Sequence, residues 1–303
     1  MKQKAFTRKN ERMYRKMKKK IWTGAILVLL FIAAMGVTVS ADNPAMKNKK
    51  WVTGQGGAYI DTDKDGKKDS YQSYGTSYYK IQIPKQGYIV VDVKTSKIPG
   101  KEEYDAYMGE GDGLEEEDDA STILYLLNSK KKKVGSCSNF FSGKNKMVFT
   151  AAVKKGTYYI SAEGDQQYKI RYTFTPVAKV SKAGKSLKKA VNLKKGATVR
   201  NLLYGDKDQY YKFTVKEKTK ITLSFNAKVR GGLLDSMGIE LLIKKGGSYQ
   251  QVDEKGKTVS KNNSVYWEMK GKDKLTATLP EGTYYIRAFT WEGMSGYYTM
   301  RWK

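Results

Sequence analysis

The stretches "YYKIQIPKQGYIVVDV" (78–93) and "YYKFTVKEKTKITLSF" (210–225) decide the fold, because they are two versions of one pattern. Apolar residues occupy the same alternate positions in both. The matched pairs are Tyr79 with Tyr211, Ile81 with Phe213, Ile83 with Val215, Ile89 with Ile221, Val91 with Leu223 and Val93 with Phe225. A period of two is typical of β-strands with one buried face, and "PKQG" and "KEKTK" are turn signals. Each stretch therefore predicts a β-hairpin.

A second motif also occurs twice. "KKGTYYISA" (154–162) in the first half of the chain matches "PEGTYYIRA" (280–288) in the second. Each is followed by an alternating segment, "YKIRYTF" (168–174) and "YTMRWK" (298–303). The recurrence of both motifs in the same order indicates two copies of one structural unit.

The alternation predicts antiparallel strands with one face on a core and the other in water. Short strands of this kind, separated by turn signals, fit two sheets packed face to face. We therefore predict an all-β fold: two tandem antiparallel, jelly-roll-like β-sandwich domains, 42–176 and 177–303, after an N-terminal signal peptide, 1–41. The segment 186–199, which leads into the second copy, is either a short helix or extended, and the extended form is favoured.

The N-terminal segment has the features of an export signal. A basic region ends in "RKMKKK" (15–20), an uncharged run covers 21–39, and the small residues "VSA" (39–41) form a signal-peptidase site. The alternative is an uncleaved membrane anchor, since the uncharged run is nearly long enough to span a bilayer. We expect a secreted or cell-surface protein of a Gram-positive-like bacterium, in contact with the membrane only through this segment if it is uncut.

The composition excludes several kinds of reaction centre. The 303 residues include no histidine and one cysteine, Cys137. Imidazole-based triads and zinc sites built on histidine are therefore excluded, and so are cysteine-rich zinc sites and disulfide frameworks. Nucleophile motifs, phosphate-binding loops and dinucleotide fingerprints are absent from the sequence as well.

The net charge indicates the kind of partner. The formal charge is +27, and removing residues 1–41 takes away ten Lys or Arg and one Glu, which leaves +18 on residues 42–303. That part contains 42 lysines but only five arginines. Lysine is a solvated point charge, whereas arginine supplies the planar fork that grips phosphates and bases. The balance favours wall polyanions or acidic glycans over nucleic acid, unless the lysines only keep the protein soluble.

The residues from 180 onward resemble a known family. "GKSLKKAVNLKKGATVRNLLYGDKDQYYKFTV" (184–215), "LPEGTYYIRA" (279–288) and a terminal "YYTMRW" (297–302) are similar to the bacterial pre-peptidase C-terminal (PPC) domain. Residues 180–303 match well and 70–176 more loosely, so the resemblance covers two tandem copies. It implies a jelly-roll-like β-sandwich that accompanies secreted hydrolases as a non-catalytic module, and it suggests a secreted protease as a partner.

The stretch "DTDKDGKKDS" (61–70) has the spacing of a calcium loop, with oxygen ligands at alternate positions around a glycine. The expected ligands are the side chains of Asp61, Asp63, Asp65 and Asp69 and the carbonyl of Lys67. The spacing also resembles the loops of dockerins and thrombospondin type 3 repeats. Gln72 stands where a bidentate Glu belongs, so we expect a weak Ca²⁺ site. The alternative is an Asp- and Gly-rich turn.

Three other features are candidates for function. The stretch 102–120 carries ten carboxylates. They form a solvated loop, a second calcium cluster, the missing ligand of the first calcium loop, or a glycosidase pair, and the solvated loop is favoured. Asp206 and Asp208, in "GDKDQYY", are expected to cap a turn rather than to bind metal. Trp291, in a predicted hairpin loop, is the candidate glycan contact, whereas the phase of its strand places Trp302 in the core.

Together these features predict a secreted, non-catalytic binding or scaffolding protein of the bacterial cell envelope. It would be stabilised by calcium and would bind glycans or polyanionic wall polymers. Two alternatives remain: a secreted glycan hydrolase that uses carboxylates of 102–119, and an accessory or chaperone module for a separately encoded secreted protease.

Overall fold

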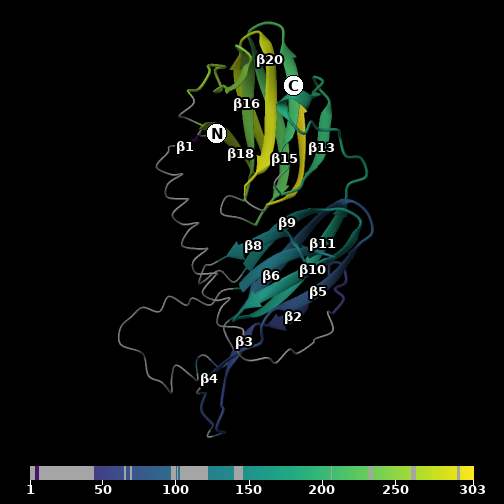
Figure 1. Ribbon diagram of the computed structural model, residues 1–303, viewed down its shortest axis with the longest axis vertical. Helices are drawn as coiled ribbons and strands as arrows, with labels where there is room; N and C mark the ends of the chain where they lie inside the picture. The colour runs from purple at the N-terminus through teal and green to yellow at the C-terminus, as the bar shows by residue number, and fades with distance from the viewer. Residues whose placement is uncertain are drawn as a thin grey trace, which may run out of the picture.

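The computed structural model describes residues 4–6, 44–64, 66–68, 70–96, 100, 102, 122–139, 146–205, 207–231, 235–260, 264–291 and 294–303. The predicted all-β fold is confirmed: the described chain forms mostly antiparallel sheets arranged as two β-sandwiches, one above the other in Figure 1. The expected signal peptide lies outside the described residues, apart from 4–6. No helix in the described ranges has the length and hydrophobicity of a membrane span.

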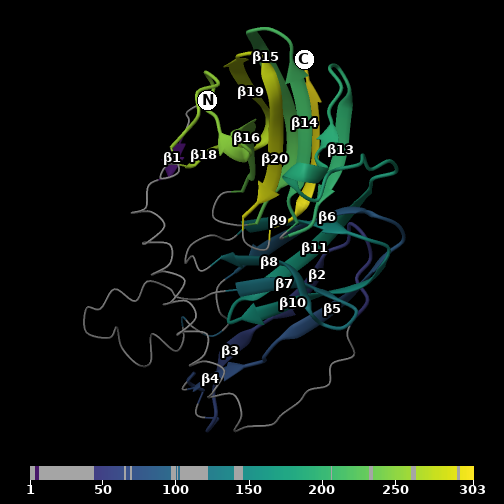
Figure 2. The ribbon, with the colours of Figure 1, turned by 45° about the horizontal axis from the view of Figure 1, so that its top comes forward.

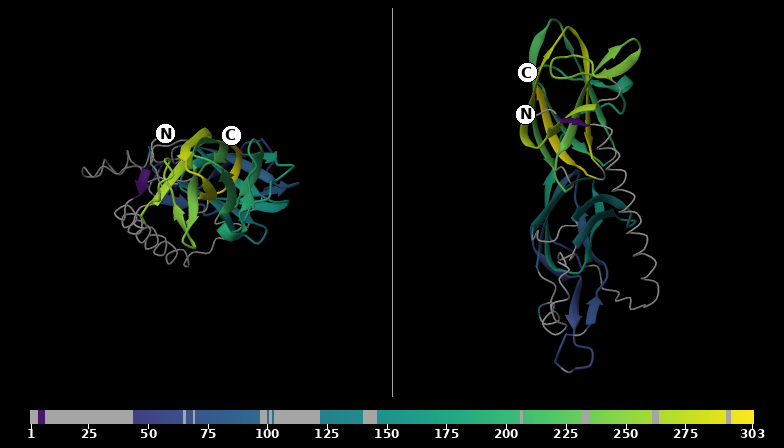
Figure 3. Two further views of the ribbon diagram at one scale, coloured as in Figure 1. Left: turned by 90° about the horizontal axis from the view of Figure 1, so that it is seen from above. Right: turned by 90° about the vertical axis from the view of Figure 1, so that its left-hand side faces the viewer.

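The first sandwich consists of two four-stranded sheets, ordered β5-β10-β7-β8 and β2-β11-β6-β9. A separate hairpin, β3–β4, projects from the end that lies away from the second sandwich (Figures 1 and 3). The strands are β2 (Val52–Gln55), β3 (Gly57–Ile60), β4 (Ser70–Ser73), β5 (Ser77–Ile83), β6 (Gly87–Thr95), β7 (Thr122–Asn128), β8 (Lys133–Asn139), β9 (Lys146–Val153), β10 (Gly156–Gly164) and β11 (Gln167–Pro176).

The second sandwich has the same strand order, β14-β20-β16-β18 against β13-β21-β15-β19 (Figure 2). β17 pairs with β16, and β1 (Lys4–Phe6) pairs with β18. A 3-10 turn, η2 (Leu187–Lys189), is followed by extended chain, so the lead-in is mostly extended. The strands are β12 (Val191–Asn192), β13 (Thr198–Leu203), β14 (Gln209–Val215), β15 (Thr219–Val229), β16 (Met237–Lys245), β17 (Ser248–Gln251), β18 (Ser264–Met269), β19 (Gly271–Leu279), β20 (Gly282–Thr290) and β21 (Gly296–Trp302).

The entry to each sandwich repeats a small detail of backbone pairing. The N–H of Met46 donates to the carbonyl of Lys80 at 2.8 Å, and the N–H of Leu193 donates to the carbonyl of Lys212 at 2.7 Å. Each donor directly follows a short parallel contact with a later strand, Ala45 with Lys80 of β5 and β12 with β14. Met46 and Leu193 are both buried, so each lead-in adds an apolar side chain to its core.

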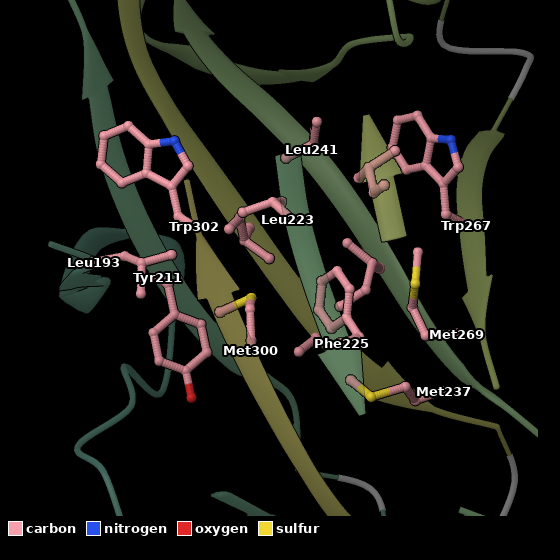
Figure 4. Packing of buried hydrophobic residues seen from close by; sticks show 14 of the residues in the cluster. Leu193, Tyr211, Leu223, Phe225, Met237, Leu241, Trp267, Met269, Met300 and Trp302 are labelled. Atoms are coloured by element: carbon pink, nitrogen blue, oxygen red, sulfur yellow. The ribbon is translucent and has the colours of Figure 1, made fainter. Parts of the chain in front are cut away.

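Alternate residues of the quoted stretches fill the two cores. All twelve matched positions are buried, whereas the residues between them face outward. Figure 4 shows part of the second core, where Tyr211, Leu223 and Phe225 meet side chains from the opposite sheet. Trp302 is 9% exposed and its ring lies 4.8 Å from that of Phe213, so its predicted inward position is confirmed. Removal of this apolar surface from water is the main stabilising term.

Each core also contains a pair of tyrosines that joins its two sheets. The hydroxyls of Tyr79 and Tyr168 share a hydrogen bond of 3.1 Å, and those of Tyr211 and Tyr298 share one of 2.7 Å. In the second sandwich the Tyr298 hydroxyl also donates to Gln209 Oε1 at 2.7 Å. Buried hydroxyls need such partners, because an unpaired one costs about 1–3 kcal/mol.

The two sandwiches are joined by a polar and aromatic contact at the edge of β9. The N–H of Thr150 donates to the carbonyl of Arg230 at 3.1 Å, and its hydroxyl donates to the carbonyl of Ser295 at 2.9 Å. Beside them the rings of Tyr88 and Tyr297 stack with their centroids 5.2 Å apart. Loops of the second sandwich therefore satisfy an edge strand of the first, which would otherwise offer unpaired backbone groups.

The buried tyrosines predict a loss of stability in alkali. Burial raises the pKa of Tyr298 well above 10.0, and burial also raises that of Tyr211. Below pH 10.0 these phenols are protonated in both states; above it they ionise more readily in the unfolded chain, so the free energy of unfolding falls as pH rises. Urea unfolding between about pH 9 and pH 11 measures this decrease. A constant free energy across that range would contradict the burial of these hydroxyls.

Candidate binding face

Three tyrosines share the outward face of the β5-β10-β7 sheet. In one row across the strands, Tyr78 lies opposite Ser161, which lies opposite Tyr125. In the next row Lys80 lies opposite Tyr159. The tyrosines are half-buried, and Ser161 is only 2% exposed although it points away from the core. A small hydroxyl residue thus stands between two aromatic rings on an outer surface. We call this row, with Tyr159, the tyrosine face.

The turn between β7 and β8 is fixed by Asn128. Its side-chain oxygen accepts hydrogen bonds from the N–H groups of Lys130 at 2.9 Å and Lys132 at 3.1 Å. Its carbonyl accepts one from the N–H of Lys131 at 2.9 Å. Lys131 has a φ of 56°, a left-handed conformation that non-glycine residues adopt at a cost. The turn therefore holds Lys131 in one defined position.

That position brings ammonium groups onto the tyrosine face. Lys131 Nζ lies 4.4 Å from the ring centroid of Tyr78 and 5.9 Å from that of Tyr159. Lys133 Nζ lies 3.5 Å from the centroid of Tyr125. Within the described residues, neither lysine forms an ion pair with a carboxylate. The rings restrain these cations through their quadrupoles but leave the full positive charge in place.

The corresponding row of the second sandwich has a different character. Tyr210 lies opposite Arg287, which lies opposite Glu240. Arg287 Nε contacts Asp208 Oδ2 at 2.7 Å and Nη1 contacts Glu240 Oε1 at 3.2 Å, while the hydroxyl of Tyr210 donates to Asp208 at 3.1 Å. Burial lowers the pKa of Arg287, but Glu240 and Asp208 outweigh it, so the pKa is raised. The charge of the arginine in this row is therefore paired with carboxylates of the same sandwich.

The structure also shows the predicted role of Asp208 to be inexact. The sequence predicts that Asp208 caps a turn, whereas the described contacts place it in an ion pair with Arg287. Asp208 directly precedes β14 and Arg287 lies in β20, so the ion pair depends on the pairing of these two strands. Asp206 and the acidic residues 103–120 lie outside the described residues, and so does any catalytic pair among them.

Part of the predicted calcium loop is described, at the tip of the β3–β4 hairpin. The carboxylate of Asp61 accepts hydrogen bonds from the N–H of Lys64 at 2.6 Å and of Gly66 at 2.8 Å. The described residues contain no group of three or more acidic, Cys or His side chains placed to hold a metal. Asp65 and Asp69 lie outside the described ranges, so calcium binding by Asp61, Asp63, Asp65, Lys67 and Asp69 stays a prediction.

The tryptophans differ in exposure from what the sequence suggests. Trp291 is half-buried and packs edge-on against Tyr266 and Phe289, with ring centroids 4.9 and 5.0 Å away. Glycan contact by Trp291 stays a prediction. Among described tryptophans, Trp51 is the exposed one, at 38%, and the Arg171 guanidinium lies 4.6 Å from its ring centroid. Sequence reasoning missed Trp51, because it precedes the recognisable strands.

Sequence reasoning also missed the tyrosine face. Two signals for it exist: the run "KKKK" at 130–133, and the "YY" pairs of both motifs, in which one tyrosine must point outward when the other points inward. Neither signal says that the lysines reach the rings, since that depends on the turn at Asn128 and on the pairing of β10 with both neighbours.

No protein-family model matches the chain, and no curated protein matches it. Among solved structures, the CUB1-EGF-CUB2 domain of human MASP-1/3 is similar over 83% of this chain and 99% of that one, with 10% identity and a TM-score of 0.22. A protein of Eubacterium rectale described as secreted is similar over 82% and 72%, with 10% identity and a TM-score of 0.23. The ANX1 ectodomain from Arabidopsis thaliana is similar over 84% and 88%, with 8% identity and a TM-score of 0.23. Scores this low carry no conclusion about function.

Proposed function

We propose that this is a secreted, non-catalytic binding and scaffolding protein of a Gram-positive-like bacterial envelope, held on polyanionic wall polymers or glycans. The observation that carries the proposal is the state of Lys131 and Lys133. Their ammonium groups lie over tyrosine rings, and no carboxylate in the described part of the chain pairs with them, so we take their charge to be available to a partner.

Two of the five arginines in residues 42–303 support the same partner class. Arg171 Nη2 is paired with Asp92 at 2.8 Å, and Arg287 with Asp208 and Glu240. Because these guanidinium groups are already occupied, they are poor candidates for the bidentate contacts by which proteins grip phosphates and bases. The remaining positive surface is mainly lysine, which supports general attraction to anionic polymers.

The junction between the sandwiches supports a scaffolding role. Hydrogen bonds of Thr150 with Arg230 and Ser295 join the second sandwich to the first. A binding face on one sandwich is therefore presented at a constant orientation to whatever the other contacts. Asp208 and Glu240 both contact the guanidinium of Arg287. We take this role to be structural, which supports a non-catalytic function.

We include calcium in this proposal as a brace for the β3–β4 hairpin. Carboxylate oxygens at alternate loop positions suit Ca²⁺, and Asp61 already draws the loop around itself through two backbone N–H groups. The hairpin is tied to the sandwich through the Tyr71 hydroxyl, which donates to Asp165. A bound ion would stiffen the projecting tip, and its effect would be on stability.

Retention on cell walls tests the proposed function. The purified protein should sediment with Gram-positive cell walls at low salt, and the bound fraction should fall steeply between about 50 and 500 mM NaCl, because exposed charges are screened beyond a Debye length of about 4–14 Å. A neutral polysaccharide matrix serves as the control. Retention that does not weaken as salt rises would contradict an electrostatic partner.

Calcium titration with thermal melting tests the brace. Sites in extracellular modules bind at about 0.1–1 mM, so several millimolar Ca²⁺ should stabilise the protein by about 1–2 kcal/mol and raise Tm. Asp61→Ala should abolish the rise. The matched control is Asp253→Ala, since Asp253 Oδ1 accepts N–H groups of Lys255 and Lys257 in a similar turn. An unchanged Tm of the wild type at several millimolar calcium would refute the calcium site.

A further inference from the structure

We propose that the tyrosine face of the first sandwich is a binding site for an acidic polysaccharide, a polymer of uronic acid. Lys131 and Lys133 would contact its carboxylates, and the phenols of Tyr78 and Tyr125 would hydrogen-bond its hydroxyls. This inference rests on the proposed function and narrows it to one face and one ligand class.

The internal comparison points to the first sandwich. The two sheets share a row of equivalent positions, filled by Tyr78, Ser161 and Tyr125 in one and by Tyr210, Arg287 and Glu240 in the other. The adjacent row is the same in both: Lys80, Tyr159 and Leu127 correspond to Lys212, Tyr285 and Leu242. One framework therefore carries an arginine paired with two carboxylates in the second sandwich, and in the first an uncharged row with the ammonium groups of Lys131 and Lys133 over its tyrosine rings.

The first face is also organised in advance for an anion. The turn at Asn128 holds Lys131 in a left-handed conformation, and the rings of Tyr78 and Tyr159 hold its ammonium group. A lysine that is already restrained loses less conformational freedom when it binds, so more of the interaction energy appears as affinity. A carboxylate partner would restrain it too but would cancel its charge.

The mixture of groups favours a charged sugar polymer over other polyanions. Tyr78 and Tyr125 flank β10 on strands roughly 10 Å apart, as sheet spacing requires, which is similar to the length of a disaccharide in an extended chain. Phenol hydroxyls both donate and accept, as sugar hydroxyls do. The cations on the face are lysines, which contact a carboxylate as point charges and lack the fork used for bidentate phosphate contacts.

Matched charge reversals test the site. K131E/K133E and K244E/K245E change the net charge equally. The first pair lies in and directly after the β7–β8 turn, the second directly before the β16–β17 turn, and all four lysines are exposed. Binding to polygalacturonate is measured by calorimetry, with dextran as the neutral probe and inorganic polyphosphate as the phosphate probe. K131E/K133E should weaken polygalacturonate binding about tenfold or more, whereas K244E/K245E should change it by less than about twofold.

A second pair of variants tests the phenols. Y78F/Y125F keeps both rings beside Ser161 but removes the hydroxyls, so it should weaken polygalacturonate binding several-fold without moving Tm. Y210F, which lies at the position equivalent to Tyr78, should leave binding unchanged. Unchanged binding by Y78F/Y125F would overturn the phenol contacts and with them the assignment of the face to a sugar.

The other outcomes separate the site from the proposed function. Equal weakening by both charge reversals, together with retention on walls, would overturn the site and leave a generally cationic binding protein. Binding of polyphosphate as tight as that of polygalacturonate would overturn the glycan assignment. If the wild type binds neither polygalacturonate nor cell walls, the site and the proposed function are overturned together.

Discussion

The register of the central strands β10 and β20 is the constraint on which the rest of the structure depends. In both sandwiches the glycine of the "GTYYI" motif lies opposite the last residue of the neighbouring strand, Gly156 opposite Ile83 of β5 and Gly282 opposite Val215 of β14. Since side chains alternate between faces, a shift of one residue would move Ile160 out of the core. The buried aliphatic residues therefore determine which side chains meet on the outer face.

Because of this constraint, the two sandwiches carry similar side chains on their inward faces but can differ on their outward faces. The inward positions must fill a close-packed core, so both copies carry similar side chains there. At the outward positions the choice of side chain is constrained only by the neighbouring side chains across the strands. Ser161 and Arg287 occupy the same outward position in their sheets, yet Ser161 lies between two tyrosines that contact lysine ammonium groups, whereas Arg287 pairs with two carboxylates. The chemical difference between the two sheets therefore lies on their outward faces.

The sequence predicted the features that depend on local pattern. The period of two, the repeated motifs and the inward position of Trp302 follow from residues close together in the chain, and the structure confirms the all-β fold and the burial of the matched positions. Contacts between distant segments were not predictable in the same way. Asp208 meets Arg287 across 79 residues, and Thr150 meets Ser295 across 145, because strand pairing brings them together.

The most direct test of the central claim, that one sandwich carries the binding face and the other a closed version of it, is an NMR titration with oligogalacturonate. The backbone amide signals of β5, β10, β7 and the turn around Asn128 should shift as the oligosaccharide is added, while those of β14, β20 and β16 should stay in place. Equal shifts on both sheets, or shifts confined to the second sandwich, would contradict the claim.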